Sequence, residues 1–162
     1  MKRALKINQS GFGIVEVLVA SVIVSLVLVG LHATTVQALR LVQQSVKRTQ
    51  AAFLAEETIE VLRSKRDSGW ASSVGTLSNG IDYFLEFDGT AWNITTANVF
   101  IDDLFERKFA LEAVYRDGND DIAGSGGVDS NTKKITVTVS WSAQTGTTTQ
   151  SVSTYITNLF QN

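Results

Sequence analysis

The feature that most constrains this chain is an apolar run from Gly11 to Leu31, GFGIVEVLVASVIVSLVLVGL. Every residue in it is apolar or small except Glu16. About 20 consecutive residues of this kind span the hydrocarbon core of a bilayer as a helix. The run therefore predicts a single transmembrane segment, and only the rest of the chain is left to build a folded domain.

Glu16 does not fit an ordinary membrane anchor. A carboxylate in hydrocarbon costs roughly 2.5–3.5 kcal/mol on insertion scales, so an acid inside the membrane needs a partner. Glu16 lies one helical turn from Phe12, whose nitrogen would become a cationic terminus if the chain were cut after Gly11. The spacing thus predicts a pairing of Glu16 with a terminal amine, formed between neighbouring copies of the protein.

A short basic leader ending in Gly11, Phe12 at the cut, Glu16 four residues further on and an apolar run form one pattern. At these residues the chain resembles the class III signal of type IV pilins and type II secretion pseudopilins. The resemblance implies cleavage after Gly11 by a prepilin peptidase, N-methylation of Phe12 and assembly into a helical filament. It also implies that Glu16 draws the amine of an adjacent subunit into register. The wording of the apolar run is more similar to minor pilins and minor pseudopilins than to the major subunit.

Two other interpretations of the N-terminus compete with this resemblance. An ordinary secretory peptide has an apolar core of 7–15 residues and a small-residue cut site. Here the run is longer, and Leu31-His32-Ala33 is a poor cut site. A plain single-pass anchor with a stray acid would leave the spacing of Gly11, Phe12 and Glu16 to chance. Both are weaker than the pilin-like interpretation.

The 162 residues leave room for the membrane helix and one small domain. We expect a leader over residues 1–11, a helix over 12–66 with 12–31 in the membrane, and a globular β head over 67–162. The basic residues Lys2, Arg3 and Lys6 place the N-terminus in the cytoplasm and the head outside. The implied location is the inner membrane, followed by a cell-surface or periplasmic filament. The implied partners are other pilin or pseudopilin subunits, the prepilin peptidase, inner-membrane lipid and the assembly platform.

The mature chain would be acidic. Three of the 14 basic residues lie before the cut, so 11 basic side chains would remain against 16 acidic ones, a formal charge of −5. A nucleic-acid-binding surface needs a basic face, so this balance argues against nucleic acid as a partner.

Beyond His32 the apolar residues recur at separations close to three, four and seven. They are Val36, Leu39, Val42, Val46, Phe53, Ala55, Ile59 and Leu62. This spacing predicts one apolar stripe on an amphipathic helix, packed against the head from Val46 to Leu62. The helix is expected from Phe12 to about Arg66, roughly 80 Å at 1.5 Å per residue, with Asp67-Ser68-Gly69 as its stop.

After Trp70 the periodicity changes to the alternation of β-strands. The predicted strands are residues 81–87, 109–115, 135–141 and 151–157, with a hairpin loop at 142–146. The apolar faces of the first two are Ile81, Tyr83, Leu85 and Phe87, and Phe109, Leu111, Ala113 and Tyr115. Residues 97–107 fit either a short helix or a further strand. The predicted fold class is α+β: a long N-terminal helix, transmembrane then amphipathic, packed on a small antiparallel meander of four or five strands. The pilin resemblance implies the same ladle shape.

The residues that could carry chemistry are few. There is no Cys, and His32 is the only histidine and lies at the end of the membrane run. Nucleophilic catalysis needs a base held beside a nucleophile, so the sequence predicts a protein that is not an enzyme and has no cofactor.

One acidic loop allows an alternative to this. Asp117, Asn119 and Asp121 have the spacing of a calcium-loop start, and Asp129 follows a glycine-rich stretch. The EF-hand pattern then fails, because it needs Gly where Ile122 stands. Asp and Asn beside Gly are also what turns use, so a β-hairpin turn is favoured. Calcium stays open as the weaker interpretation, since some pseudopilins bind it in this part of the head.

The sequence therefore favours a structural minor pilin or pseudopilin that is assembled into, or caps, a pilus-like filament. Filaments of this family serve adhesion, motility, DNA uptake or secretion. The alternative is a membrane-anchored binding module, whose head recognises DNA, a surface or a secreted substrate.

Overall fold

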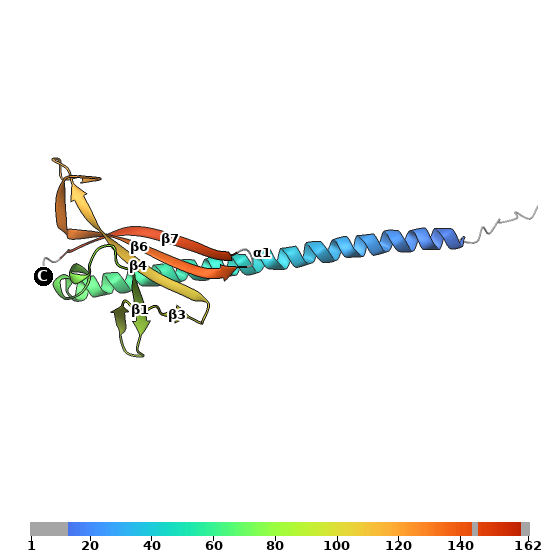
Figure 1. The fold of residues 1–162 in the computed structure, drawn as a ribbon, viewed down its shortest axis with the longest axis horizontal. Coiled ribbons are helices and arrows are strands. Elements are labelled where there is room, and N and C mark those ends of the chain that lie inside the picture. Colours follow the sequence, from blue (N-terminus) through green and yellow to red (C-terminus); the bar gives the residue numbers. More distant parts are fainter. Residues whose placement is uncertain (1–12, 144–145, 160–162) are drawn as a thin grey trace, which may run out of the picture. The chain divides into compact units, whose positions relative to one another are not determined.

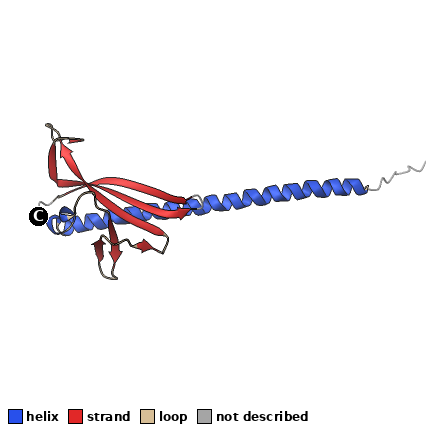
Figure 2. Cartoon of the chain, viewed as in Figure 1, coloured by secondary structure: helices blue, strands red, loops and turns tan. Residues whose placement is uncertain are grey.

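The computed structural model describes residues 13–143 and 146–159. These residues form an α+β fold in which one long N-terminal apolar helix packs on a seven-stranded antiparallel sheet (Figures 1 and 2). The predicted fold class is therefore confirmed. The helix is α1 (Ile14–Ser68), and two 3-10 turns follow it, η1 (Trp70–Ser72) and η2 (Val74–Thr76). The strands are β1 (Tyr83–Phe87), β2 (Trp92–Thr95), β3 (Phe100–Ile101), β4 (Phe105–Arg116), β5 (Ile122–Ala123), β6 (Gly127–Ala143) and β7 (Gly146–Thr157).

The chain divides into two compact units, Met1–Gln43 and Gln44–Asn162, so α1 contributes to both. In the first unit the described chain is helix from Ile14 onward, and its large apolar side chains are exposed except for the half-buried Val36. The helix ends at Ser68, inside the predicted stop.

In the second unit, α1 packs on the sheet through a narrow stripe. Its buried residues include Ala51, Ala55, Ile59 and Leu62, which recur every three or four positions, as one face of a helix requires. The predicted stripe was wrong at Val46 and Phe53, whose side chains are 51% and 65% exposed. At 100° per residue, Phe53 points almost opposite to Ala51 and Ala55, and these two small residues are the ones that meet the sheet.

The sheet has the strand order β2-β1-β4-β6-β7, with β3 and β5 also paired to β4. Its three long strands, β4, β6 and β7, follow one another in space, as a meander requires. The first two strands do not extend this meander in chain order, because β1 pairs with β4 and β2 pairs with the other edge of β1. The core lies between the sheet and α1, and its largest fully buried side chains include Phe109, Leu62, Leu111 and Ile135.

A β-bulge interrupts the pairing of β4 with β6. Ala113 lies opposite Lys133, whereas the next residue, Val114, lies opposite Asp129. Residues 130–132 of β6 therefore have no partner on β4, and the inside-outside alternation of β4 is reversed beyond this point. Val114 is buried and Tyr115 is 37% exposed, so the prediction that Tyr115 shares the core face was wrong.

Beyond the bulge, residues 114–129 form an arm that includes β5 and the ends of β4 and β6. Figure 1 shows the arm bending away from the rest of the sheet. Bulges bend the strand that carries them and increase its twist, which accounts for this change of direction.

Other local predictions had mixed outcomes. The undecided residues 97–107 contain β3 and the start of β4, joined by a turn in which Asp102 and Asp103 have positive φ angles of 52° and 53°. The strand predicted over 81–87 begins at Tyr83 as β1, so Ile81 lies outside it. Ile81 and Phe87 are exposed, so only part of the predicted apolar face is buried.

Candidate processing and assembly site

The first turn of α1 is organised around Glu16. The Gly13 backbone N–H donates a hydrogen bond to Glu16 Oε2 at 3.1 Å, and the Glu16 N–H donates to the Gly13 carbonyl at 3.0 Å. The Glu16 side chain turns back toward the start of the helix and accepts from a backbone N–H that would otherwise lack a partner. The carboxylate also lies at the positive end of the helix dipole. Glu16 is thus held beside the N-terminus of the helix.

The surface that follows Glu16 is apolar and uncovered. α1 is long and apolar enough to cross a membrane, and none of its apolar window is buried within the described chain. The hydroxyls in this stretch bond within the helix: Ser21 Oγ donates to the Leu18 carbonyl at 2.8 Å, and Ser25 Oγ to the Ser21 carbonyl at 2.7 Å. Because lipid offers no hydrogen bonds, such internal pairing suits a helix in a bilayer.

The predicted processing residues Gly11 and Phe12 lie outside the described residues. The structure therefore places one of the three predicted site residues, Glu16. The roles of all three stay predictions.

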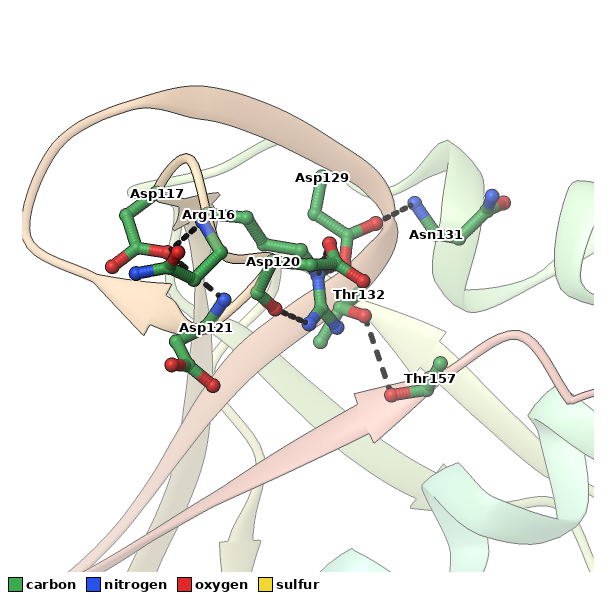
Figure 3. Close-up of polar contacts among 9 residues, drawn as sticks. Arg116, Asp117, Asp120, Asp121, Asp129, Asn131, Thr132 and Thr157 are labelled. Atoms are coloured by element: carbon green, nitrogen blue, oxygen red, sulfur yellow. Dashed lines mark hydrogen bonds and ion pairs between the residues drawn. The ribbon is translucent and has the colours of Figure 1, made fainter.

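In the second unit, the acidic residues predicted as weak calcium candidates form a turn and an ion pair within the arm (Figure 3). Asp117 Oδ1 accepts hydrogen bonds from the backbone N–H groups of Asn119 at 2.8 Å and Asp121 at 3.1 Å. This is the Asx geometry of a turn. Asp129 Oδ2 accepts from Arg116 Nε at 2.7 Å, across the pairing of β4 with β6.

Arg116 is the centre of this cluster. Its Nη1 donates to the Asp120 carbonyl at 2.7 Å, while its Nε also lies 3.6 Å from Asp120 Oδ1. The hydrogen bond from Arg116 holds the pKa of Asp129 below its usual value, and the same contact raises the pKa of Arg116. The arrangement joins the two strands of the arm electrostatically.

Among the described residues, no group of three or more His, Cys, Asp or Glu side chains is placed to hold a metal ion. The contacts of Asp117 and Asp129 are those of a turn and an ion pair. That the protein has no cofactor stays a prediction.

Sequence analysis missed a buried charge beneath the sheet. Arg107 on β4 is 3% exposed and pairs through Nη1 with Glu57 of α1, while its guanidinium lies 5.2 Å from the centre of the Trp92 ring. Its Nε has no hydrogen-bond partner in the described chain. The available signal was its position, because Arg107 alternates in phase with the core residues Phe105 and Phe109. A cation at an inward position predicts a buried partner.

Comparison with known proteins adds one finding. A family model described as the prokaryotic N-terminal methylation motif matches residues 6–31. No curated protein and no solved structure matches the chain. The matched segment contains Gly11, Phe12 and Glu16 together with the uncovered apolar part of α1. The chain thus carries a type IV pilin-like signal, and this signal with the apolar helix is consistent with membrane anchoring.

Proposed function

We propose that this chain is a minor type IV pilin or pseudopilin, a structural and non-enzymatic subunit. A prepilin peptidase cuts it after Gly11 and methylates Phe12, and the mature chain enters or caps a pilus-like filament. The observation that carries the proposal is the coincidence of the methylation motif over residues 6–31 with an apolar helix that nothing within the described chain covers.

The apolar helix supplies the mechanism of storage and assembly. In the membrane its side chains face lipid, and in a filament they would face the helices of neighbouring subunits. Transfer from one to the other exposes little apolar surface to water, so assembly avoids the free-energy cost of hydrating it. The intrahelical bonds of Ser21 and Ser25 can persist in both environments.

Glu16 supplies the register. Cleavage after Gly11 creates a cationic nitrogen on Phe12, next to the Gly13 N–H that already bonds Glu16. The carboxylate is therefore positioned at the end of the helix where the terminal amine of a neighbouring subunit would arrive. Pairing the two charges removes the cost of an isolated carboxylate in an apolar surrounding.

The proposal is tested first by the N-terminal residue and mass of the mature protein. We expect N-methylated Phe12 in a host that has its prepilin peptidase and an intact N-terminus in the same host without it. An unprocessed chain in both hosts would refute the proposal.

A second test separates the charge of Glu16 from its role as a helix cap. Glu16→Gln keeps a side-chain oxygen that can accept from the Gly13 N–H, whereas Glu16→Ala does not. If the charge sets the register, both variants should be cleaved normally and both should be lost from the filament. Normal incorporation of Glu16→Gln would show that capping alone is required.

A further inference from the structure

A cavity lies in the angle between the arm and the rest of the sheet. Its volume is about 470 Å³, within the range of about 300–1,000 Å³ that is usual for small-molecule sites. The arm contributes residues 114, 115 and 122–124 to the lining, and the sheet contributes residues 112, 113, 134 and 155. A straight pairing of β4 with β6 would form no such angle, so the cavity follows from the bulge that bends the arm.

The bulge also decides which side chain of β4 reaches this cavity. Side chains alternate between the faces of a strand, so Tyr115, three residues after Glu112, would ordinarily lie on the opposite face. The reversed alternation beyond the bulge brings both residues to the lining of the same cavity. The second aromatic ring of the lining comes from β7, where Tyr155 lies directly opposite Lys134 of β6. Two tyrosines that are 40 positions apart in the sequence thus line one cavity.

Both tyrosines present accessible surface to a ligand. Tyr115 is 37% exposed and Tyr155 is 49% exposed. A tyrosine ring is a rigid apolar surface that ends in a hydroxyl group, so it offers contact area and a hydrogen bond at a low cost in conformational entropy. The pair therefore favours a ligand that has both apolar faces and polar groups.

The charges of the cavity neutralise each other. Lys134 Nζ donates to Glu112 Oε2 at 2.9 Å, and the two residues lie directly opposite on β6 and β4. Among the described residues that line the cavity, only these two are charged. A charged ligand would have to compete with this ion pair, whereas a neutral ligand can bond the N–H groups and carboxylate lone pairs that the ion pair leaves free. The site therefore favours a neutral ligand.

The sheet contributes a face to this cavity, and its side chains make the contacts there. The strand β6 is paired with β4 on one side and with β7 on the other around Lys134, so its backbone groups are already used. An extended peptide is usually recognised through the free backbone groups of an edge strand, which β6 does not offer. This arrangement argues against a peptide as the ligand.

The outer face next to the cavity is neutral and rich in hydroxyl groups. Two positions beyond Lys134 and Tyr155, the hydroxyls of Thr136 and Ser153 lie 2.9 Å apart. Two positions further, the hydroxyls of Thr138 and Ser151 lie 3.1 Å apart. A hydroxyl both donates and accepts, so these pairs extend the polar surface over which a longer ligand can form hydrogen bonds.

We propose that this cavity binds a neutral saccharide. A sugar ring has C–H faces that lie against Tyr115 and Tyr155, and hydroxyl groups that bond Glu112 and Lys134. Further sugar residues of an oligosaccharide lie over the adjacent hydroxyl pairs. All the lining residues belong to the second unit, so the inference does not depend on cleavage or filament assembly.

An array of neutral and acidic oligosaccharides tests the proposal. The probe is the labelled full-length chain, solubilised in a detergent without a sugar headgroup, because such a headgroup would compete for the cavity. We expect binding to neutral oligosaccharides. Absence of binding to every neutral oligosaccharide would overturn the proposal. Binding to a matching peptide array alone would also overturn it and would indicate a protein partner.

Alanine variants locate the binding in the cavity. Tyr115→Ala and Tyr155→Ala should each weaken the binding of the strongest neutral oligosaccharide by about tenfold, a loss typical of a central aromatic contact. Phe100→Ala removes a 57% exposed ring that lies outside the cavity, and it should leave the affinity unchanged. Full affinity in both tyrosine variants, or equal losses in all three variants, would overturn the proposal. Tryptophan fluorescence of each variant verifies that the sheet is folded.

A second pair of variants tests the preference for a neutral ligand. Glu112→Gln leaves Lys134 without its countercharge, so it should add binding to acidic oligosaccharides. Glu106→Gln is the matched control, because it removes a carboxylate of β4 that lies outside the cavity and bonds Asn98. It should leave the specificity unchanged. The same specificity in Glu112→Gln as in the native chain would contradict the role of the ion pair and overturn the assignment of a neutral ligand.

Discussion

Removing Glu57 should destabilise the fold more than removing the arginine that it neutralises. Arg107 is 3% exposed, its Nη1 bonds Glu57, and its Nε has no hydrogen-bond partner in the described chain. Glu57→Gln therefore leaves a buried guanidinium without a countercharge. Arg107→Met removes both the charge and the unpaired Nε, and keeps a side chain that fills the space.

The magnitudes follow from burial. A hydrogen bond to a charged group contributes about 1.5–3 kcal/mol. Breaking a fully buried ion pair costs about 3–5 kcal/mol, but Glu57 is 45% exposed, so we expect about 2 kcal/mol for Glu57→Gln. Arg107→Met loses the same bond and the contact with the Trp92 ring, and gains from the desolvation it no longer requires. Its cost should lie within about 1 kcal/mol of zero.

Urea denaturation of the detergent-solubilised chain, followed by tryptophan fluorescence, would measure both variants. All three tryptophans, Trp70, Trp92 and Trp141, lie in the unit that contains the sheet, so the signal reports on its unfolding. A loss of 2 kcal/mol lowers the urea midpoint by about 1 M at a typical denaturant slope. The double variant should resemble Arg107→Met. A larger loss in Arg107→Met than in Glu57→Gln would refute the reasoning.

Three further predictions concern the arm and the helix contact. Gly126→Ala should cost about 1–3 kcal/mol, because the new Cβ would collide with the Arg116 carbonyl at a φ of +144°; an unchanged urea midpoint would contradict this. The pKa of Asp129 is lowered by Arg116, so its stabilisation is present above the unfolded pKa of about 3.9 and is lost as the pH falls through the lower folded value. The stability difference between the native chain and Asp129→Asn should therefore shrink between about pH 5 and pH 2, and a constant difference would argue against the ion pair. Leu62→Ala should cost about 2–5 kcal/mol, because Leu62 is fully buried, whereas Phe53→Ala should cost less than about 1 kcal/mol. Equal losses would contradict the packing of α1 on the sheet through the face that contains Leu62.

The strands show how far local patterns reach. The alternation over residues 135–141 predicted the strand, and Ile135, Val137, Val139 and Trp141 on one of its faces are all buried in β6. The same argument failed at Tyr115. The bulge that turns Tyr115 outward arises from three extra residues on β6, and nothing in the sequence of β4 signals them. Which residues of one strand lie opposite another is decided by contacts that are distant in sequence.

The candidate site divides in the same way. The pilin-like signal could be predicted from the spacing of Gly11, Phe12 and Glu16, because that spacing is a local pattern. The family model that matches residues 6–31 covers the same three residues. The pair of Arg107 and Glu57 was missed because its members are 50 residues apart. From its sequence neighbours alone, Glu57 is interpreted as one of several acidic residues on a solvent-exposed face of the helix.

The sequence by itself determined the long helix, its apolar N-terminal half, the pilin-like signal and the antiparallel class of the sheet. Each follows from a period or a spacing within a short stretch of chain, where backbone geometry alone places the side chains. Only the tertiary structure decided the exposure of Phe53 on α1, the bulge that bends the arm, the buried ion pair and the position of β7 at an edge of the sheet. These depend on which segments meet, and that is settled by the packing of the whole unit.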